Sequence, residues 1–246
     1  MIDNETVRKL RELNLGEFVD IIDVQQKDPS LITLPFDERM KRIVDYVYQQ
    51  KHNRRIQNLI KMAKFRFPKA DVLDIDYNNR GFERNTIEEL ITCGYMEMPA
   101  NIVLEGYTGS GKTWMSCALG KQACAFMKKV RYIRLPDLLV MYEEKKHLSN
   151  LHLEKLLAKF SRYDLLIIDE WLMEDLSREE IHFIFELIER RYDTHSTIFC
   201  TQYRKEDWLE RLGSDVHAEA ITDRIIHKVI WIQMGSRNMR ENPNIR

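Results

Sequence analysis

The sequence predicts a doubly wound α/β domain of about five parallel strands, preceded by a small helical region. Beyond residue 100, five short apolar runs alternate with helical patterns, and each run is apolar throughout rather than at every second position. Strands of that kind are typical of a parallel sheet whose two faces are both covered by helices. A glycine-rich stretch at residues 106–113, between the first run and a helical pattern, is typical of a phosphate-binding loop.

The composition is ordinary for a soluble globular protein. The chain has 246 residues, 44% hydrophobic and 31% charged, enough for one large domain or a domain with a smaller appendage. It lacks a secretory apolar segment and any apolar run of about 18 residues, so we expect it to be neither exported nor membrane-spanning. No CxxC pair occurs, which favours buried free thiols and a reducing, cytoplasmic setting, the cysteines being Cys93, Cys117, Cys124 and Cys200.

Residues 1–68 are expected to form a helical, basic region that interacts with DNA or a partner. Apolar residues at helical spacing predict one helix over residues 4–26, with Asp28 and Pro29 as its stop, and a second from about residue 37 to just before Pro68. Residues 39–69 hold ten Lys or Arg against one acid, Asp45, a local charge of +9. Such a block fits a surface that follows a nucleic-acid backbone, and a solvated helix face fits it equally well.

Residues 69–246 are expected to form the main domain, which the stretch "FPKADVLDIDYNNRGF" connects to the helices. Its five predicted strands are residues 101–106, 130–135, 164–170, 196–202 and 229–234. Helical patterns at 112–129 and 178–193 lie between them, and the apolar positions of the second pattern are expected in the core.

The stretch "GYTGSGKT" matches the phosphate-loop pattern GxxxxGK[ST]. Glycines let backbone N–H groups point at phosphates, at the positive end of the following helix. Lys112 would reach the β and γ phosphates of ATP, and the Thr113 hydroxyl would ligate Mg²⁺. The alternative is a glycine-rich turn before an amphipathic helix. The predicted nucleotide contacts are Gly106, Tyr107, Thr108, Gly109, Ser110, Gly111, Lys112, Thr113 and Trp114.

Two later strands end in polar residues that belong at the same sheet edge. "DLLIIDE" presents Asp169, expected to hold Mg²⁺ with Thr113, and Glu170, expected to activate the attacking water as general base. "STIFCTQ" ends at Gln202, which is placed to sense the γ-phosphate, although an ordinary strand-end residue is the alternative.

The order of these parts resembles an AAA+ ATPase and, more narrowly, the IstB and DnaC clade of transposition helpers and helicase loaders. Over residues 35–241 the segments "DLLIIDEW", "LIERRYDTHSTIFCTQYRKEDW", "ITDRIIHKVIWIQM" and "GSRNMR" are similar to IstB-family segments. The resemblance implies a five-stranded AAA+ domain without a separate lid, the sensor role for Gln202, and Arg224 as the arginine given to a neighbour's ATP site. Arg190 and Arg191 are rival candidates, and a salt-bridged surface arginine beside Asp223 is the alternative for Arg224.

The resemblance also implies an ATPase that self-assembles on duplex DNA, selects or remodels a target site and activates a partner transposase. A replicative helicase loader is the nearest alternative; an ATP-binding switch with little hydrolysis and a small-molecule kinase are others. ATP and Mg²⁺ are the expected cofactors, and no membrane partner is expected. Arg240 is a further candidate contact for nucleotide or DNA. The candidate DNA contacts are Arg39, Arg42, Lys51, Arg54, Arg55, Lys61 and Lys64.

Overall fold

The computed structural model describes residues 2–78 and 80–239, so Arg240 lies outside the described residues. The chain divides into two compact units, Met1–Asn58 and Leu59–Arg246. Residues beyond Asn58 join the second unit because Leu59 and Ile60 pack against its hydrophobic core. No helix in the described ranges is both long and apolar enough to cross a membrane.

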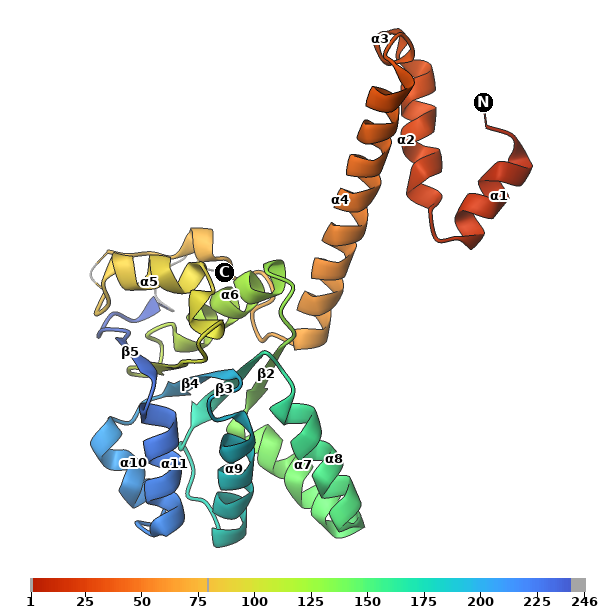
Figure 1. Ribbon diagram of the computed structural model, residues 1–246. Coiled ribbons are helices and arrows are strands. Elements are labelled where there is room, and N and C mark those ends of the chain that lie inside the picture. The colour runs from red at the N-terminus through yellow and green to blue at the C-terminus, as the bar shows by residue number, and fades with distance from the viewer. Residues whose placement is uncertain (1, 79, 240–246) are drawn as a thin grey trace. The chain divides into compact units, whose positions relative to one another are not determined.

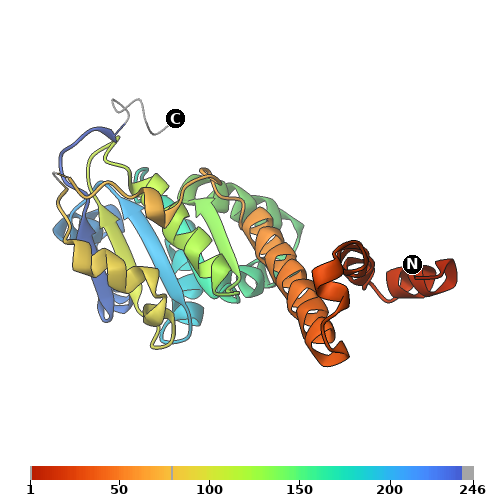
Figure 2. The same cartoon turned by 90° about the horizontal axis from the view of Figure 1, so that it is seen from above.

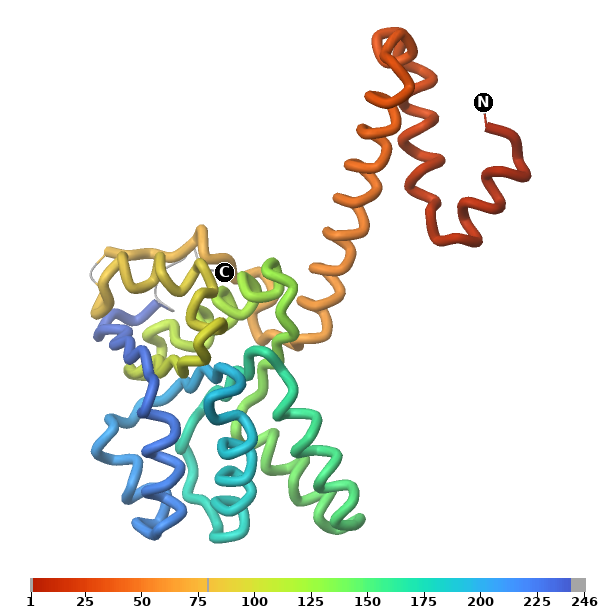
Figure 3. Tube along the Cα trace, in the orientation of Figure 1, coloured from red at the N-terminus to blue at the C-terminus, as the bar shows by residue number. Residues whose placement is uncertain are grey.

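The first unit is helical, as expected, but its first segment is two helices rather than one. They are α1 (Asn4–Glu12) and α2 (Gly16–Lys27). Asn14 between them adopts a left-handed conformation with φ 57°, which ends the first helix. Figure 3 shows that the chain turns between the two helices. The short α3 (Pro29–Ile32) follows the predicted stop and is capped by the Asp28 carboxylate, which accepts a 2.9 Å hydrogen bond from the Ser30 N–H.

The long helix α4 (Phe36–Ala63) begins in the first unit. It packs on α2, burying Ile43 and Val47, and Gln25 Nε2 of α2 donates a 3.0 Å hydrogen bond to the Arg39 carbonyl. Since the remaining helices of this unit are short, the stability of its small core depends on this one helix pair.

The second unit is built on a parallel sheet of five strands in the described residues, in the order β2-β3-β4-β1-β5. Each predicted strand is confirmed to within one residue at either end. The strands are β1 (Asn101–Glu105), β2 (Val130–Arg134), β3 (Leu165–Trp171), β4 (Ser196–Thr201) and β5 (Val229–Gln233).

Helices cover both faces of the sheet, as Figures 1 and 2 show. Along β1, Ile102 and Leu104 enter the core beneath α6, whereas Val103 enters the core on the opposite face. This double burial explains why the strands are apolar throughout.

One face carries η1 (Val72–Asp74), α5 (Arg84–Ile91), η2 (Gly94–Met96) and α6 (Lys112–Ala125). The other carries α7 (Leu135–Leu148), α8 (Asn150–Ser161), α9 (Arg178–Arg191), α10 (Lys205–Arg211) and α11 (Val216–Ile226).

The four cysteines, all within the described residues, are buried free thiols, as the sequence predicted. Burial raises the pKa of Cys93 and of Cys117 to about 11, so both remain protonated at neutral pH.

Candidate nucleotide-binding site

The glycine-rich loop joins β1 to the start of α6. Gly109 and Gly111 have φ values of 87° and 92°, a conformation that side chains with a Cβ rarely adopt. Gly111 is the N-cap of α6, so the loop closes around the positive end of that helix. The loop thus has the backbone geometry required to direct N–H groups at an anion.

The Lys112 ammonium lies over this loop. Its Nζ donates to the carbonyl oxygens of Gly106 and Tyr107, at 2.5 and 3.0 Å. The buried hydroxyl of Ser110 has no hydrogen-bond partner among the described residues. A cation inside a loop of this geometry fits phosphate oxygens.

Beside the loop lies a pocket of about 520 Å³. Gly106, Tyr107 and Ser110 lie outside its lining in the part of the chain described, and the Tyr107 side chain is exposed. The other predicted nucleotide contacts line it, together with Asp169, Glu170 and Gln202; they are Thr108, Gly109, Gly111, Lys112, Thr113 and Trp114.

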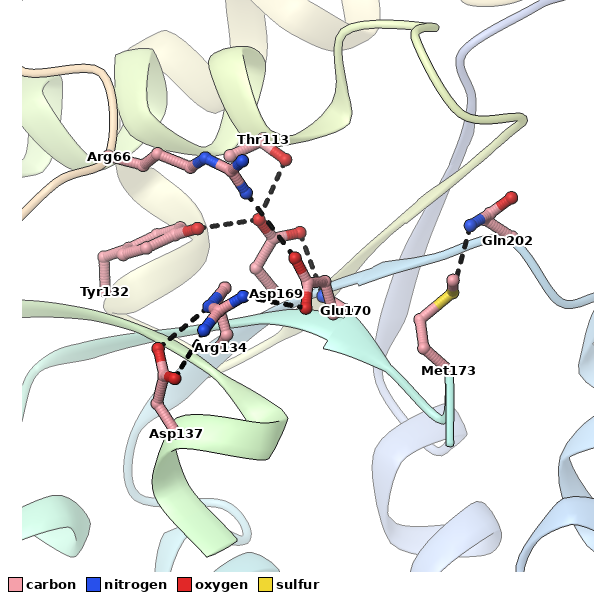
Figure 4. Close-up of polar contacts among 9 residues, drawn as sticks. All are labelled: Arg66, Thr113, Tyr132, Arg134, Asp137, Asp169, Glu170, Met173 and Gln202. Atoms are coloured by element: carbon pink, nitrogen blue, oxygen red, sulfur yellow. Dashed lines mark hydrogen bonds and ion pairs between the residues drawn. The ribbon is translucent and has the colours of Figure 1, made fainter. Parts of the chain in front are cut away.

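Asp169 and Thr113 meet at the centre of this site (Figure 4). Thr113 Oγ1 donates a 2.8 Å hydrogen bond to Asp169 Oδ2, and the Asp169 side chain comes from β3, where it is 2% exposed. A hydroxyl and a carboxylate are oxygen donors of the kind that Mg²⁺ prefers. The residues therefore fit a nucleotide-bound Mg²⁺.

Tyr132 of β2 completes this cluster. Its hydroxyl donates a 2.7 Å hydrogen bond to the same Oδ2 of Asp169. Burial, followed by the charge of Asp169, raises the pKa of Tyr132, so the phenol keeps its proton. The sequence interpretation did not single out Tyr132, because only the pairing of β2 with β3 brings the two side chains together.

Glu170 occupies an irregular position at the end of β3. The register with β4 shifts between Ile168 and Trp171, and Glu170 has a left-handed φ of 58°. This conformation is uncommon for a residue other than glycine. It costs of order 1 kcal/mol or more of folding free energy, which the surrounding contacts must offset. The shift turns the Glu170 carboxylate into the pocket rather than along the strand.

The Glu170 carboxylate is paired with arginines on both oxygens. Arg66 Nη1 lies 3.5 Å from Oε1, and Arg134 Nη1 lies 3.5 Å from Oε2. Arg134 is fixed by Asp137 through hydrogen bonds of 2.6 and 2.9 Å, and these bonds, then the charge of Glu170, raise the pKa of Arg134. The sequence interpretation had assigned neither arginine to the site; Arg134 could have been found as a charged residue ending a predicted strand.

Gln202 links the end of β4 to the loop. Thr108 Oγ1 donates a 3.0 Å hydrogen bond to Gln202 Oε1, and Gln202 Nε2 donates to Met173 Sδ at 3.0 Å. The structure therefore brings Gln202 together with Lys112, Asp169 and Glu170, where the sequence had placed it.

Arg224 lies far from this pocket, at the amino ends of the strands. It lines a separate hollow with Asn101, the first residue of β1, and Thr197, the second residue of β4. Its guanidinium pairs with Glu189 of α9 and lies 5.1 Å from the centre of the Phe185 ring. The phosphate loop lines the other pocket, at the carboxyl ends of the strands.

The rival arginines differ sharply in environment. Arg190 pairs with Glu154 on α8 at 3.0 Å and is partly exposed. Arg191 is 2% exposed, and burial lowers its pKa to about 9. Because it is buried and fully hydrogen-bonded, the Arg191 guanidinium is not available to contact a neighbouring subunit. It donates to the Thr197 hydroxyl and to the carbonyls of Phe160, Ser161, Tyr163 and Ser196.

The candidate DNA contacts divide between the two units. In the first, Arg39 bonds Gln25, Arg42 pairs with Glu38 and Arg54 pairs with Glu17 at 2.7 Å. Lys51 and Arg55 of that unit, and Lys61 and Lys64 of the second, are exposed.

Known proteins similar to this chain are described as ATP-binding proteins. The family model described as IstB-like ATP binding protein matches residues 8–245. An insertion-sequence ATP-binding protein of Sinorhizobium fredii is 27% identical, over 98% of this chain and 96% of its own. That of the insertion sequence IS5376 from Geobacillus stearothermophilus is 31% identical, over 86% of this chain and 83% of its own. The DnaC helicase loader structure matches with a TM-score of 0.56 and 21% identity, over 68% of this chain and 98% of that chain, a similarity of fold.

Proposed function

The chain belongs to the family of IstB-like ATP-binding proteins, and from this premise we propose that it is an ATPase that assembles on duplex DNA and helps the transposase of an insertion sequence. The observation that carries the enzymatic part is the placement of Glu170 on the pocket that Lys112 and Asp169 also line. A module that only binds ATP has no need of a second carboxylate there. The relatives' description as insertion-sequence proteins supports the biological setting.

Each residue of the pocket has a part in the proposed hydrolysis. The loop N–H groups and Lys112 bind the β and γ phosphates, while Thr113 and Asp169 hold Mg²⁺, which when bound offsets phosphate charge. Glu170 orients a water and takes its proton as the water oxygen bonds to the γ-phosphorus and the bond to ADP breaks. Gln202 positions the same water or the γ-phosphate from the β4 side.

Assembly is the second part of the proposal. Arg224 lies at the amino ends of the strands, whereas the loop lies at their carboxyl ends, so one subunit's Arg224 can serve only another subunit's site. A guanidinium delivered in trans adds positive charge where the transition state becomes more negative. Hydrolysis then requires that subunits stack head to tail.

DNA is the proposed scaffold for this stack. Exposed lysines and arginines of α4 would contact phosphates, which positions the protein without reading base sequence. Contacts of this kind make affinity fall steeply with salt.

The test is to follow particle mass by light scattering with duplex DNA, single-stranded DNA or none, each with ATP, ADP or no nucleotide. We expect mass to rise most with duplex DNA and ATP. No gain in mass, or a gain independent of nucleotide, would contradict assembly on DNA. A preference for single strands would instead favour a helicase loader.

A further inference from the structure

The segment that follows α4 is locked onto the core of the second unit. Lys64 has a left-handed φ of 57°, which ends the helix and reverses the chain. Phe65 then enters the core above Gly120 of α6, where a Cβ on the glycine would lie 2.6 Å from Phe65 Cε1. Glycine at position 120 thus leaves the space that Phe65 fills, and this fixes the backbone of the next residue, Arg66.

Arg66 projects from this anchored segment into the candidate nucleotide pocket. Arg66 and Phe67 line the pocket together with Lys112 and Thr113. In Figure 4 the guanidinium reaches toward Asp169 and Glu170 from the side of Thr113. The side chain is 50% exposed, and besides a contact with the Tyr132 side chain it has a loose ion pair with Glu170, at 3.5 Å. An exposed, loose ion pair contributes little, so a stronger anionic partner can replace it.

We propose that Arg66 binds the γ-phosphate of ATP within its own subunit, an inference that rests on the proposed ATPase function. Arginine presents a planar fork of donors that matches phosphate oxygens, and a terminal phosphate carries more negative charge than the carboxylate that Arg66 now faces. Arg66 thereby distinguishes ATP from ADP, and its move to the phosphate relieves Glu170 of one of its two positive partners.

Arg134 supplies a contrast within the same structure. It also pairs with Glu170, but Asp137 holds it in place, and it is absent from the described lining of the nucleotide pocket. Both arginines therefore influence Glu170, and Arg66 alone of this pair faces the phosphate loop.

The experiment compares Arg66→Ala, Arg66→Lys and the matched control Arg134→Ala with the wild type. Equilibrium binding of fluorescent ADP and of a fluorescent, slowly hydrolysed ATP analogue is measured with Mg²⁺. We expect Arg66→Ala to weaken analogue binding by about tenfold or more, the size of one charge-assisted hydrogen bond, with ADP affinity retained. Arg66→Lys should retain part of the preference, and Arg134→Ala should keep the wild-type ratio of the two affinities.

Three results would overturn the inference. An equal loss of affinity for ADP and for the ATP analogue would mean that Arg66 only supports the structure. Unchanged affinity for both nucleotides would mean that Arg66 does not bind the γ-phosphate. The same change of ratio in Arg134→Ala would mean that the effect passes through Glu170. If the wild type itself binds neither nucleotide, the proposed function fails as well, which separates that failure from the other three.

Discussion

The hydroxyl group of Tyr132 donates a 2.7 Å hydrogen bond to Oδ2 of Asp169, the oxygen that Thr113 also contacts. Because the phenol is buried and stays protonated, it is a permanent donor. It leaves the carboxylate little freedom to rotate, which holds Asp169 ready for a cation beside Thr113.

Tyr132→Phe removes this donor while keeping the ring. We expect the Mg²⁺ concentration for half-maximal ATP binding to rise about tenfold, since a hydrogen bond to a charged group contributes roughly 1.5–3 kcal/mol. Nucleotide binding in EDTA should be unchanged. The matched control is Tyr95→Phe, because the buried Tyr95 hydroxyl has no hydrogen-bond partner in the described ranges. An unaltered Mg²⁺ titration in Tyr132→Phe would show that Asp169 needs no such support.

Glu170→Gln keeps the shape of the side chain and removes the base. We expect hydrolysis to slow by about 10²–10⁴-fold with ATP binding retained, the usual contribution of a general base. Steady-state phosphate release with duplex DNA present measures the rate, and Glu174→Gln, a nearby carboxylate outside the described lining of the nucleotide pocket, is the control. Equal rates in Glu170→Gln and wild type would remove Glu170 from the mechanism.

Arg224→Ala should lower hydrolysis by about 10³-fold if the arginine acts in trans. Lys112→Ala should be inactive for a different reason, because it cannot bind phosphates. Mixing the two variants should restore activity, since each Lys112→Ala subunit lends an intact Arg224 to an Arg224→Ala subunit with an intact loop. The control is Arg190→Ala mixed with Lys112→Ala in the same way. A mixture no more active than its parts would argue that Arg224 only stabilises α11 against α9.

Arg191→Leu tests the buried guanidinium. It leaves several carbonyl oxygens without a donor, so we expect the free energy of unfolding to fall by about 3–5 kcal/mol, the usual result of breaking a buried charged network. The neighbouring Arg190→Leu loses only a partly exposed ion pair and should cost about 1 kcal/mol or less. Urea denaturation of both variants measures the difference, and equal losses would mean that the Arg191 bonds contribute little.

The sheet and the phosphate loop could be predicted because their evidence is local in the sequence. Each buried strand is a continuous apolar run, and the glycines, Lys112 and Thr113 are consecutive or nearly so. Asp169 and Glu170 were found the same way, since they end such a run.

The features that were missed depend on strand order or on distant segments. Tyr132 meets Asp169 because β2 pairs with β3, and Arg66 reaches Glu170 across more than a hundred residues of chain. Arg191 in "LIERRYD" was a rival candidate for the arginine given to a neighbour, but the carbonyls that hold it belong mainly to the end of α8 and the start of β4. The break at Asn14 went unseen because a left-handed residue without glycine leaves no plain mark in a helical pattern.

The order of strands also bears on how the protein is made. In the sheet β1 lies between β4 and β5, which come from residues 196–201 and 229–233 and so follow β1 in the chain. Neither edge of β1 has its hydrogen-bond partners until those segments have left the ribosome. Until then, the phosphate loop that follows β1 is not held in position by a folded sheet. A nascent chain should therefore acquire nucleotide affinity only after β4 and β5 have been synthesised. Transcripts cut short before residue 229 should yield polypeptides that cannot compete with complete subunits for ATP.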